Sequence, residues 1–169
     1  MKRVLVLGCP GSGKSVLAGR LHRLTGLPLI HLDQLWWRAD GSHVSRAEFD
    51  EALTRVLRQP SWIIDGDYRR TWEVRVAACD TVFFLDYAPE VCCAGIRARV
   101  GQPRPDMPWV EQQADPDLLE AAAQYRATRR PELLKLLARY PKAAQHVFIS
   151  REAADAWLSA WTQEAGLTP

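Results

Sequence analysis

The segment Gly8 to Ser15, with the sequence Gly-Cys-Pro-Gly-Ser-Gly-Lys-Ser, constrains the fold most strongly, because it directly follows the apolar run Val4 to Leu7. It satisfies the pattern G-x-x-x-x-G-K-[ST], in which glycines let the backbone turn sharply between a strand and a helix. Successive backbone N–H groups then converge on phosphate oxygens at the helix N-terminus. The segment therefore predicts a phosphate-binding loop for ATP or GTP.

Two residues of this loop have distinct predicted roles. Lys14 is expected to reach the β- and γ-phosphates, and Ser15 is expected to ligate Mg²⁺. Only four of the 22 basic residues are lysines, so a lysine here departs from the chain's preference for arginine. We therefore expect ATP and Mg²⁺ as cofactors, bound by Gly8, Pro10, Gly11, Ser12, Gly13, Lys14, Ser15 and Val16.

Length and composition favour a single domain over residues 1–169. The chain is 47% hydrophobic, which suits a sizeable core, and it is too short for a phosphate loop with a separate second domain. The net charge is +2 without a long basic run, so we expect no direct binding to nucleic acid. No apolar stretch approaches the ~20 residues of a membrane span, which predicts no membrane partner.

The four cysteines, Cys9, Cys79, Cys92 and Cys93, have neither C-x-x-C spacing nor a pattern of histidine partners. We expect them to be reduced and mostly buried thiols. This usage predicts a cytoplasmic protein, and we expect a monomer or a homodimer.

Strand-like and helix-like segments alternate along the chain, which is typical of an α/β fold with a parallel sheet covered on both faces. The predicted strands are short and apolar: Arg3–Leu7, Pro28–Leu32, Trp62–Asp65, Thr81–Asp86 and His146–Ile149. Helices are predicted at about 14–25, 45–59, 70–78, 89–100, 116–139 and 151–164. Asp115 and Ser150 are predicted N-caps. The proline-rich residues 101–108 fit neither element, and they predict either a connector or a mobile lid.

Two predicted strands end in an aspartate that is placed to hold Mg²⁺ directly or through water, Asp65 and Asp86. We favour Asp65, because residues 66–70 follow it and bring two arginines to the same carboxyl edge of the sheet. For Asp86, a loop or N-cap role ahead of Pro89 is the alternative. The predicted metal ligands are therefore Ser15 and Asp65.

Arginine clusters suit phosphoryl transfer, in which a protein acts mainly by positioning groups and neutralising developing charge. Arg69 and Arg70 are the primary pair. Arg97, Arg99 and Arg104 flank the proline-rich stretch, and Arg126, Arg129 and Arg130 share part of one helix face. Solvated surface charge is the alternative for each of these arginines. The predicted catalytic residues are Lys14, Asp65, Arg69, Arg70, Arg97 and Arg130.

The segment His31 to Trp37 follows the second strand and offers a carboxylate beside two large aromatic residues. Asp33 is suited to accept a hydrogen bond from a hydroxyl or to take its proton, and the tryptophans are suited to stack on a base or a sugar. Packing is the alternative for both tryptophans, and His31 is expected to be packed or hydrogen-bonded. The predicted acceptor site comprises Asp33, Trp36, Trp37, Arg69 and Arg126.

Together these segments resemble the adenylate-kinase-like P-loop kinases, and most closely the small bacterial group of DNA topology modulation proteins. The phosphate loop, His31 to Trp37, Trp62 to Thr71 and Arg104 to Met107 carry the likeness, which extends over nearly the whole chain. The resemblance implies a three-layer α/β/α P-loop fold with a five-stranded parallel sheet in the order 2-3-1-4-5. It also implies a short lid over about 97–114, lid arginines near Arg97, and further phosphate-contacting arginines between residues 125 and 131.

The chain departs from adenylate kinases at several positions. Tyr68 stands where those enzymes have a proline, and Asp67 stands where the bacterial group has an asparagine. A negative charge at position 67 disfavours a phosphorylated acceptor. The short lid carries no cysteine quartet, and the threonine-containing segment that holds the AMP base in adenylate kinases is missing, so AMP is not implied as the acceptor.

These residues predict an ATP-dependent phosphotransferase of the nucleoside- or nucleotide-kinase type that acts on a small-molecule acceptor. A small-metabolite kinase of the shikimate or gluconate type is the alternative among enzymes, because Asp33 is placed to grip substrate hydroxyls. A non-catalytic nucleotide-binding regulator linked to DNA topology is the alternative outside enzymes. The combination of Asp65 with the arginines favours catalysis over that role.

Overall fold

In the computed structural model, which describes residues 1–166, five strands form one parallel sheet in the order β2-β3-β1-β4-β5. This confirms the predicted fold class and strand order. In register, Val6 of β1 lies opposite Asp65 of β3 and Phe83 of β4. The strands are β1 (Arg3–Gly8), β2 (Leu29–His31), β3 (Trp62–Asp65), β4 (Thr81–Leu85) and β5 (Ala144–Phe148).

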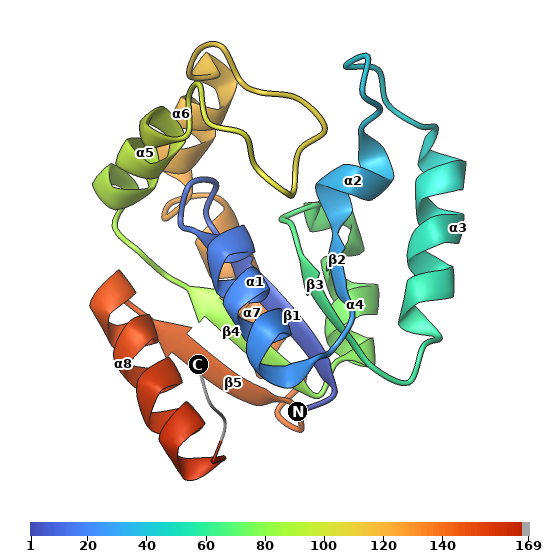
Figure 1. Cartoon of the computed structure of the whole chain (residues 1–169), viewed down its shortest axis with the longest axis vertical. Helices are drawn as coiled ribbons and strands as arrows, with labels where there is room; N and C mark the ends of the chain where they lie inside the picture. Colours follow the sequence, from blue (N-terminus) through green and yellow to red (C-terminus); the bar gives the residue numbers. More distant parts are fainter. Residues whose placement is uncertain (167–169) are drawn as a thin grey trace.

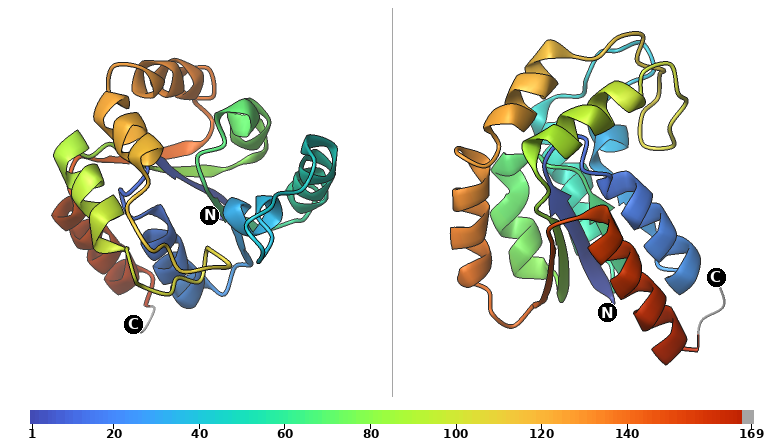
Figure 2. Two further views of the ribbon diagram at one scale, coloured as in Figure 1. Left: turned by 90° about the horizontal axis from the view of Figure 1, so that it is seen from above. Right: turned by 90° about the vertical axis from the view of Figure 1, so that its left-hand side faces the viewer.

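Helices cover both faces of this sheet (Figures 1 and 2). One face carries α1 (Lys14–Thr25) and α8 (Arg151–Glu164), and the other carries α4 (Trp72–Ala78) and α7 (Arg129–Ala138). Beside β2 lie the short helix α2 (Leu32–Trp36) and α3 (Arg46–Leu57). At the carboxyl edge of the strands lie α5 (Pro89–Ala98), α6 (Pro116–Gln124) and the connection between them, residues 99–115, here called the 99–115 loop.

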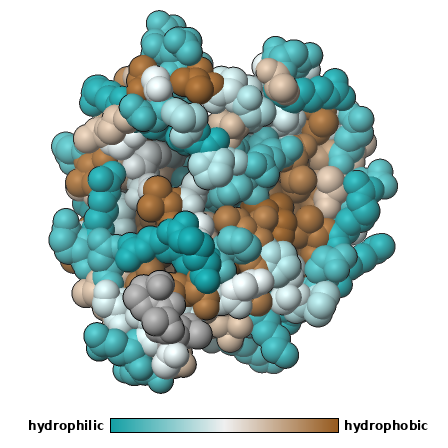
Figure 3. Space-filling model, in the orientation of Figure 1, coloured by the Kyte–Doolittle hydropathy of each residue, from teal (hydrophilic) through white to brown (hydrophobic). Residues whose placement is uncertain are grey.

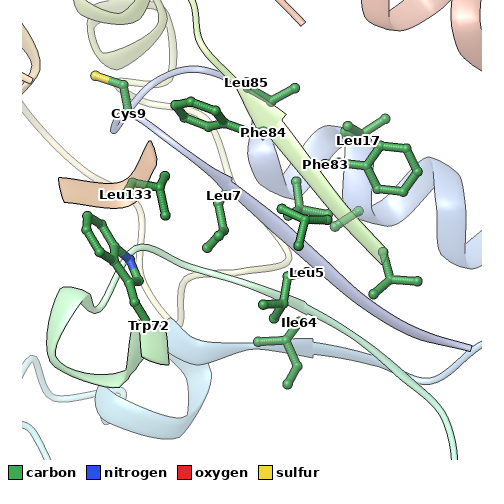
Figure 4. Close-up of a cluster of buried hydrophobic side chains, with 14 of the residues drawn as sticks. Leu5, Leu7, Cys9, Leu17, Ile64, Trp72, Phe83, Phe84, Leu85 and Leu133 are labelled. Atoms are coloured by element: carbon green, nitrogen blue, oxygen red, sulfur yellow. The ribbon is translucent and has the colours of Figure 1, made fainter. Parts of the chain in front are cut away.

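The core consists of the central strands and the helices on either side. Every residue of β3 and β4 is buried, as expected for parallel strands covered on both faces. Successive side chains of β4 point to opposite faces of the sheet. In Figure 4, Phe84 points toward Leu133 of α7, and Phe83 points toward Leu17 of α1. Phe83 also packs edge-on against Trp157 of α8, with ring centroids 4.9 Å apart.

Some predicted boundaries differ from the structure. The predicted helix at 116–139 is two helices, because Pro131 has no backbone N–H and fits only the first turn of a new helix, α7. The fifth strand begins at Ala144 and ends at Phe148, and most of its residues are not fully buried, since it is an edge strand. The second strand ends at His31, and residues 32–36 form α2. A short 3₁₀ turn, Arg69–Thr71, precedes α4.

The predicted helix caps are confirmed. Ser150 accepts a hydrogen bond from the N–H of Ala153, and Asp115 accepts one from the N–H of Asp117. A capping box that joins Ser45 and Glu48 also begins α3.

The surface and the cysteines agree with this architecture. On the face shown in Figure 3, the largest apolar area lies over the edge strand β2, between α1 and α3, where Leu29 and Ile30 are half-buried. Cys9 and Cys92 are buried, and none of the four cysteines forms a disulfide. Within residues 1–166, no helix combines the length and the apolar character that a membrane span requires.

Candidate active site

The phosphate loop runs from the end of β1 to the start of α1, and its glycines are sterically required. Gly13 is the N-cap of α1 with φ 93°, and Gly11 has φ 78°, both in the left-handed region that favours glycine. A Cβ at Gly11 would lie 2.1 Å from the carbonyl oxygen of Cys92 in α5. The loop is therefore pressed against α5 by backbone contact.

The loop presents positive potential at the N-terminus of α1. Lys14 Nζ donates hydrogen bonds to the carbonyl oxygens of Gly8 and Cys9, at 3.1 and 2.9 Å, so the ammonium lies across the loop. The first turn of α1 carries no acidic residue, and its N-cap is a glycine. A helix N-terminus of this kind attracts the negative charge of a phosphate.

Asp65 lies at the carboxyl end of β3, next to the phosphate loop. Its side chain is buried, and its Oδ1 lies 2.7 Å from Nδ1 of His31, at the end of β2. Burial lowers the pKa of His31, but the hydrogen bond and charge of Asp65 outweigh burial, so the pKa lies above its ordinary value of 6.5. His31 is thus hydrogen-bonded, as predicted, and it fixes the orientation of Asp65.

Asp33, in the first turn of α2, is held by a residue that sequence analysis did not assign to the site. Tyr68 donates a hydrogen bond of 2.8 Å from its hydroxyl to Asp33 Oδ1. Its ring stacks on Phe49 of α3 at 5.0 Å between centroids, and its backbone has φ 32°. Burial raises the pKa of Asp33 above its ordinary value of 3.8, and the bond from Tyr68 offsets this only in part.

A buried arginine, Arg75 of α4, holds the segment that carries these groups. Its guanidinium donates to the carbonyl oxygens of Gly66 (3.0 Å), Asp67 (2.5 Å) and Tyr68 (3.3 Å), and its side chain is fully buried. Burial lowers its pKa to about 10. No sequence motif marks Arg75, because its role depends on a loop that folds back over α4.

The predicted arginines are mostly engaged in ion pairs. Arg69 pairs with Glu132 at 2.6 Å, and Arg70 pairs with Asp50 at 2.5 Å. Arg130 makes a bidentate pair with Asp86, its Nε lying 2.7 Å from Oδ1 and its Nη2 2.7 Å from Oδ2. This pair gives Asp86 a structural partner in the loop after β4, in line with the alternative reading of that aspartate. Arg129, a member of the predicted helix-face cluster, pairs with Asp67 at 2.5 Å.

The 99–115 loop reaches the phosphate loop (Figure 2, left). Asp106 Oδ2 accepts a hydrogen bond of 2.8 Å from the hydroxyl of Ser15 and one of 3.2 Å from Arg104. Pro105 accepts a hydrogen bond from the side-chain amide of Gln34. The loop itself is braced by Glu111, which pairs with Arg99 at 2.7 Å. The sequence signals near this contact were the proline-rich stretch itself and the likeness of Arg104 to Met107 to the resembled family, and neither assigned Asp106 to the site.

One open cleft of about 1330 Å³ collects most of these groups. It is bounded by the phosphate loop, α1, α2, the end of β3, the 99–115 loop and the starts of α7 and α8. Of the residues predicted from the sequence, those that line it are Pro10, Gly11, Ser12, Gly13, Lys14, Ser15, Val16, Asp33, Trp37, Asp65 and Arg69.

The remaining predicted residues do not line this cleft: Gly8, Trp36, Arg70, Arg97, Arg126 and Arg130. Gly8 lies at the end of β1, where a Cβ would meet the carbonyl oxygen of Leu85 at 2.7 Å. Arg70 and Arg130 pair with Asp50 and Asp86, Arg97 is exposed in α5, and Arg126 is exposed in the turn between α6 and α7. Residues that line the cleft but were not assigned to the site include Tyr68, Arg104, Asp106, Trp109 and Arg129.

Aromatic side chains form one wall of the cleft. Trp37 and Trp109 both line it and meet edge to face, with centroids 5.4 Å apart. Trp36 stacks on His43 at 4.6 Å and meets Phe49 edge-on at 5.6 Å. The two neighbouring tryptophans therefore have different environments. Trp37 faces the cleft, whereas Trp36 packs on the side of this wall that faces away from it.

A metal ion of the kind that binds at phosphate loops fits the donor set. Such sites use a loop serine or threonine, one or two carboxylates, and oxygens of the nucleotide phosphates. Ser15 and Asp65 both line the cleft. Among residues 1–166, no group of three or more His, Cys, Asp or Glu side chains is arranged to hold a metal ion by itself.

Comparison with known proteins gives the fold. No protein-family model matches the chain, and no curated protein sequence matches it. Solved structures do match it, and two shikimate kinases are among them. Shikimate kinase from Bacteroides thetaiotaomicron matches with a TM-score of 0.61 and 19% identity over 98% of this chain and 99% of that one. Shikimate kinase from Aquifex aeolicus vf5 matches with a TM-score of 0.54 and 16% identity over 96% and 98%.

The chain therefore has the P-loop kinase fold found in shikimate kinases. These two structures are shikimate kinases, so they do not test the closer resemblance to the DNA topology modulation proteins. That resemblance stays a prediction from the sequence motifs.

Proposed function

We propose that this protein is a P-loop phosphotransferase that transfers the γ-phosphoryl group of ATP to a hydroxyl of a small acceptor. One observation carries the proposal: the phosphate loop shares a cleft with Asp33, a carboxylate that Tyr68 holds by a hydrogen bond. Carboxylates placed in this way bind the acceptor hydroxyl and accept its proton. In this proposal residues 97–114 form the lid of a single kinase domain.

Each group has a task that follows from its position. The N–H groups of the phosphate loop and Lys14 bind the nucleotide phosphates, and Ser15 with Asp65 would hold Mg²⁺. The bound cation would neutralise charge that develops on the transferred phosphoryl group. Arg104 and Arg129 line the same cleft, but Arg104 is paired with Asp106 and Arg129 with Asp67, so each would have to leave its carboxylate before it could bind a phosphate. The 99–115 loop, which contacts Ser15, would exclude water from this part of the cleft.

The ion pairs of Arg69 and Arg70 favour an acceptor without a phosphate. A phosphorylated acceptor requires free guanidinium groups that can bind it bidentately. Arg70 is paired with Asp50 outside the cleft, and Arg69, which lines it, is paired with Glu132. The structural neighbours are kinases named for shikimate, a small hydroxylated metabolite, and this also supports a small-metabolite acceptor.

A nucleoside or nucleoside monophosphate is the second candidate acceptor. The aromatic wall formed by Trp37 and Trp109 supports it, because such rings stack on a base. The sequence motifs alone favour this candidate, whereas the ion pairs of Arg69 and Arg70 favour the first.

The test is incubation with Mg·ATP and a panel of hydroxylated metabolites, nucleosides and nucleoside monophosphates, followed by mass spectrometry of the products. With the acceptor that is found, Asp33→Asn is expected to lower kcat by ~10²-fold, and Arg69→Ala is expected to change kcat and KM little. A sharp rise in KM for Arg69→Ala with little effect of Asp33→Asn would favour the nucleotide candidate. Binding of ATP without transfer to any acceptor would favour a nucleotide-binding regulator.

A further inference from the structure

Asp106 is a buried carboxylate from the 99–115 loop that lies directly over the phosphate loop. Its relative exposure is 3%, although it belongs to a connection between two helices. Asp106 is 91 residues away from Ser15 in the sequence. Its Oδ2 nevertheless accepts a hydrogen bond of 2.8 Å from the Ser15 hydroxyl. Burial of a charged group at a loop tip is unfavourable unless something binds that charge.

The partners of Asp106 are unevenly distributed between its two oxygens. Oδ2 accepts the bonds from Ser15 and Arg104, whereas Oδ1 is buried and accepts no hydrogen bond from residues 1–166. A carboxylate oxygen left in this way loses its hydration without a replacement, which is unfavourable by an amount comparable to a lost hydrogen bond. One oxygen of Asp106 is therefore buried without a hydrogen-bond donor from residues 1–166.

The spacing of Asp106 and Ser15 matches that of two ligands of one cation. Octahedral Mg²⁺ binds oxygens at ~2.0–2.1 Å, so two adjacent ligands lie ~2.9 Å apart. The Ser15 hydroxyl, which is the predicted metal ligand of the phosphate loop, and Asp106 Oδ2 are 2.8 Å apart. A cation that Ser15 holds can therefore be shared with Asp106 by a small movement of the two side chains.

The 99–115 loop is also braced in a way that keeps Asp106 in this place. Arg104 contacts both Asp106 (3.2 Å) and Glu111 (3.5 Å), and Arg99 pairs with Glu111. The side-chain amide of Gln34 in α2 donates to the carbonyl oxygen of Pro105, the residue before Asp106. The loop thus approaches Ser15 as a unit that is linked to α2.

We propose that Asp106 is a ligand of the divalent cation at Ser15, supplied by the 99–115 loop, which couples closure of this loop to binding of the metal–nucleotide complex. The inference rests on the proposed function, because it requires a metal–nucleotide site at the phosphate loop. Coupling of this kind is reciprocal: the cation stabilises the closed loop, and the closed loop raises the affinity for the cation.

The test measures binding of Mn²⁺, a cation that takes the same oxygen ligands as Mg²⁺, to the full chain with ADP by electron paramagnetic resonance. Asp106→Asn is expected to weaken Mn²⁺ binding by about tenfold or more, since even groups outside the first coordination shell are worth ~10–100-fold. Asp117→Asn, the same change at an exposed position outside the cleft, is the matched control and is expected to bind Mn²⁺ like the unaltered protein. Thermal unfolding of each variant without metal reports on folding.

A second variant tests ligation directly. Asp106→Cys replaces an oxygen ligand by a thiolate, which prefers soft cations, so Cd²⁺ is expected to bind this variant more tightly than it binds Asp106→Asn, while Mn²⁺ binding stays weak in both. Mn²⁺ affinity unchanged in Asp106→Asn, or equal Cd²⁺ affinity in both variants, would overturn the inference while leaving the proposed function intact. Tighter nucleotide binding in Asp106→Asn would overturn it in favour of an occluding contact. Absence of metal-dependent ADP binding in the unaltered protein would overturn the proposed function together with the inference.

Discussion

Replacement of Gly95 by alanine tests the backbone contact that positions the phosphate loop. Gly95 lies within α5, where alanine by itself favours the helix by ~0.8–1 kcal/mol. The structure reverses this expectation, because a Cβ at position 95 would lie 2.1 Å from the carbonyl oxygen of Gly11 and 3.0 Å from its carbonyl carbon. Both neighbours are backbone atoms, so no side chain can rotate away.

The magnitude follows from these distances. The phosphate loop or α5 must shift by about 0.9 Å before the contact lengthens from 2.1 to 3.0 Å, which is still shorter than ordinary contacts. Overpacking costs ~1–3 kcal/mol, and a contact with backbone on both sides belongs at the upper end. After the gain in helix propensity, Gly95→Ala is expected to lower the free energy of unfolding by ~1–2 kcal/mol. For a chain of this length that lowers Tm by roughly 2–8 °C.

Gly19→Ala is the matched control. Gly19 also lies inside a helix, α1, but a Cβ there would meet only Arg23 Nη1 at 3.8 Å. This variant is expected to raise the free energy of unfolding by ~0.5–1 kcal/mol and Tm by roughly 1–4 °C. Calorimetric unfolding of both variants and titration with ADP are the assays, and Gly95→Ala is also expected to weaken ADP binding. A similar rise in Tm for both variants would refute the argument.

Three further changes test the site and its support. Lys14→Ala is expected to abolish transfer and to weaken Mg·ATP binding by about tenfold or more in a folded protein, and unchanged ATP affinity by calorimetry would contradict the assigned role. Arg75→Met leaves the carbonyl groups of residues 66–68 without their buried donor. It is expected to lower the free energy of unfolding, measured in urea, by ~3–5 kcal/mol. A loss below ~1 kcal/mol would show that water replaces the guanidinium. Burial raises the pKa of Asp80, but hydrogen bonds from Thr81 and from the backbone at the start of β1 outweigh burial, so the pKa lies below its ordinary value of 3.8. The resulting stability is present above pH 3.8 and is lost as the pH falls through the lowered pKa. Asp80→Asn is therefore expected to destabilise the protein at about pH 7 and to flatten the acid limb of a curve of stability against pH. An unchanged acid limb would exclude this role.

The fold was predictable because local patterns agree with one another along the chain. The apolar run before Gly8, the glycine spacing of the loop and the buried strands ending at Asp65 and Leu85 each specify a parallel sheet with ligands at its carboxyl edge. The predicted boundaries of helices and strands were wrong where the local sequence pattern was weak or was outweighed by a single residue. Pro131 marks a new helix within the predicted 116–139 helix, and β5 is an edge strand with a mixed pattern of burial.

The arginines show why the candidate site was only partly predictable. Their number and spacing do not reveal which carboxylate each one meets, because pairs such as Arg70 with Asp50 and Arg130 with Asp86 join elements distant in sequence. An arginine that neutralises a carboxylate is no longer free to bind a phosphate.

The sequence by itself determined the phosphate loop, the parallel sheet and the carboxylates at its edge, because backbone turns and the periodicity of buried residues are local properties of neighbouring residues. The strand order followed only from the resemblance to adenylate-kinase-like P-loop kinases, and the structure bears it out. Tertiary structure alone decided that Tyr68 holds Asp33, that Arg75 supports the segment after β3, and that Asp106 lies against Ser15. Each of these contacts depends on how a loop folds back over distant elements. That placement follows from the packing of the whole chain, which no local pattern of residues encodes.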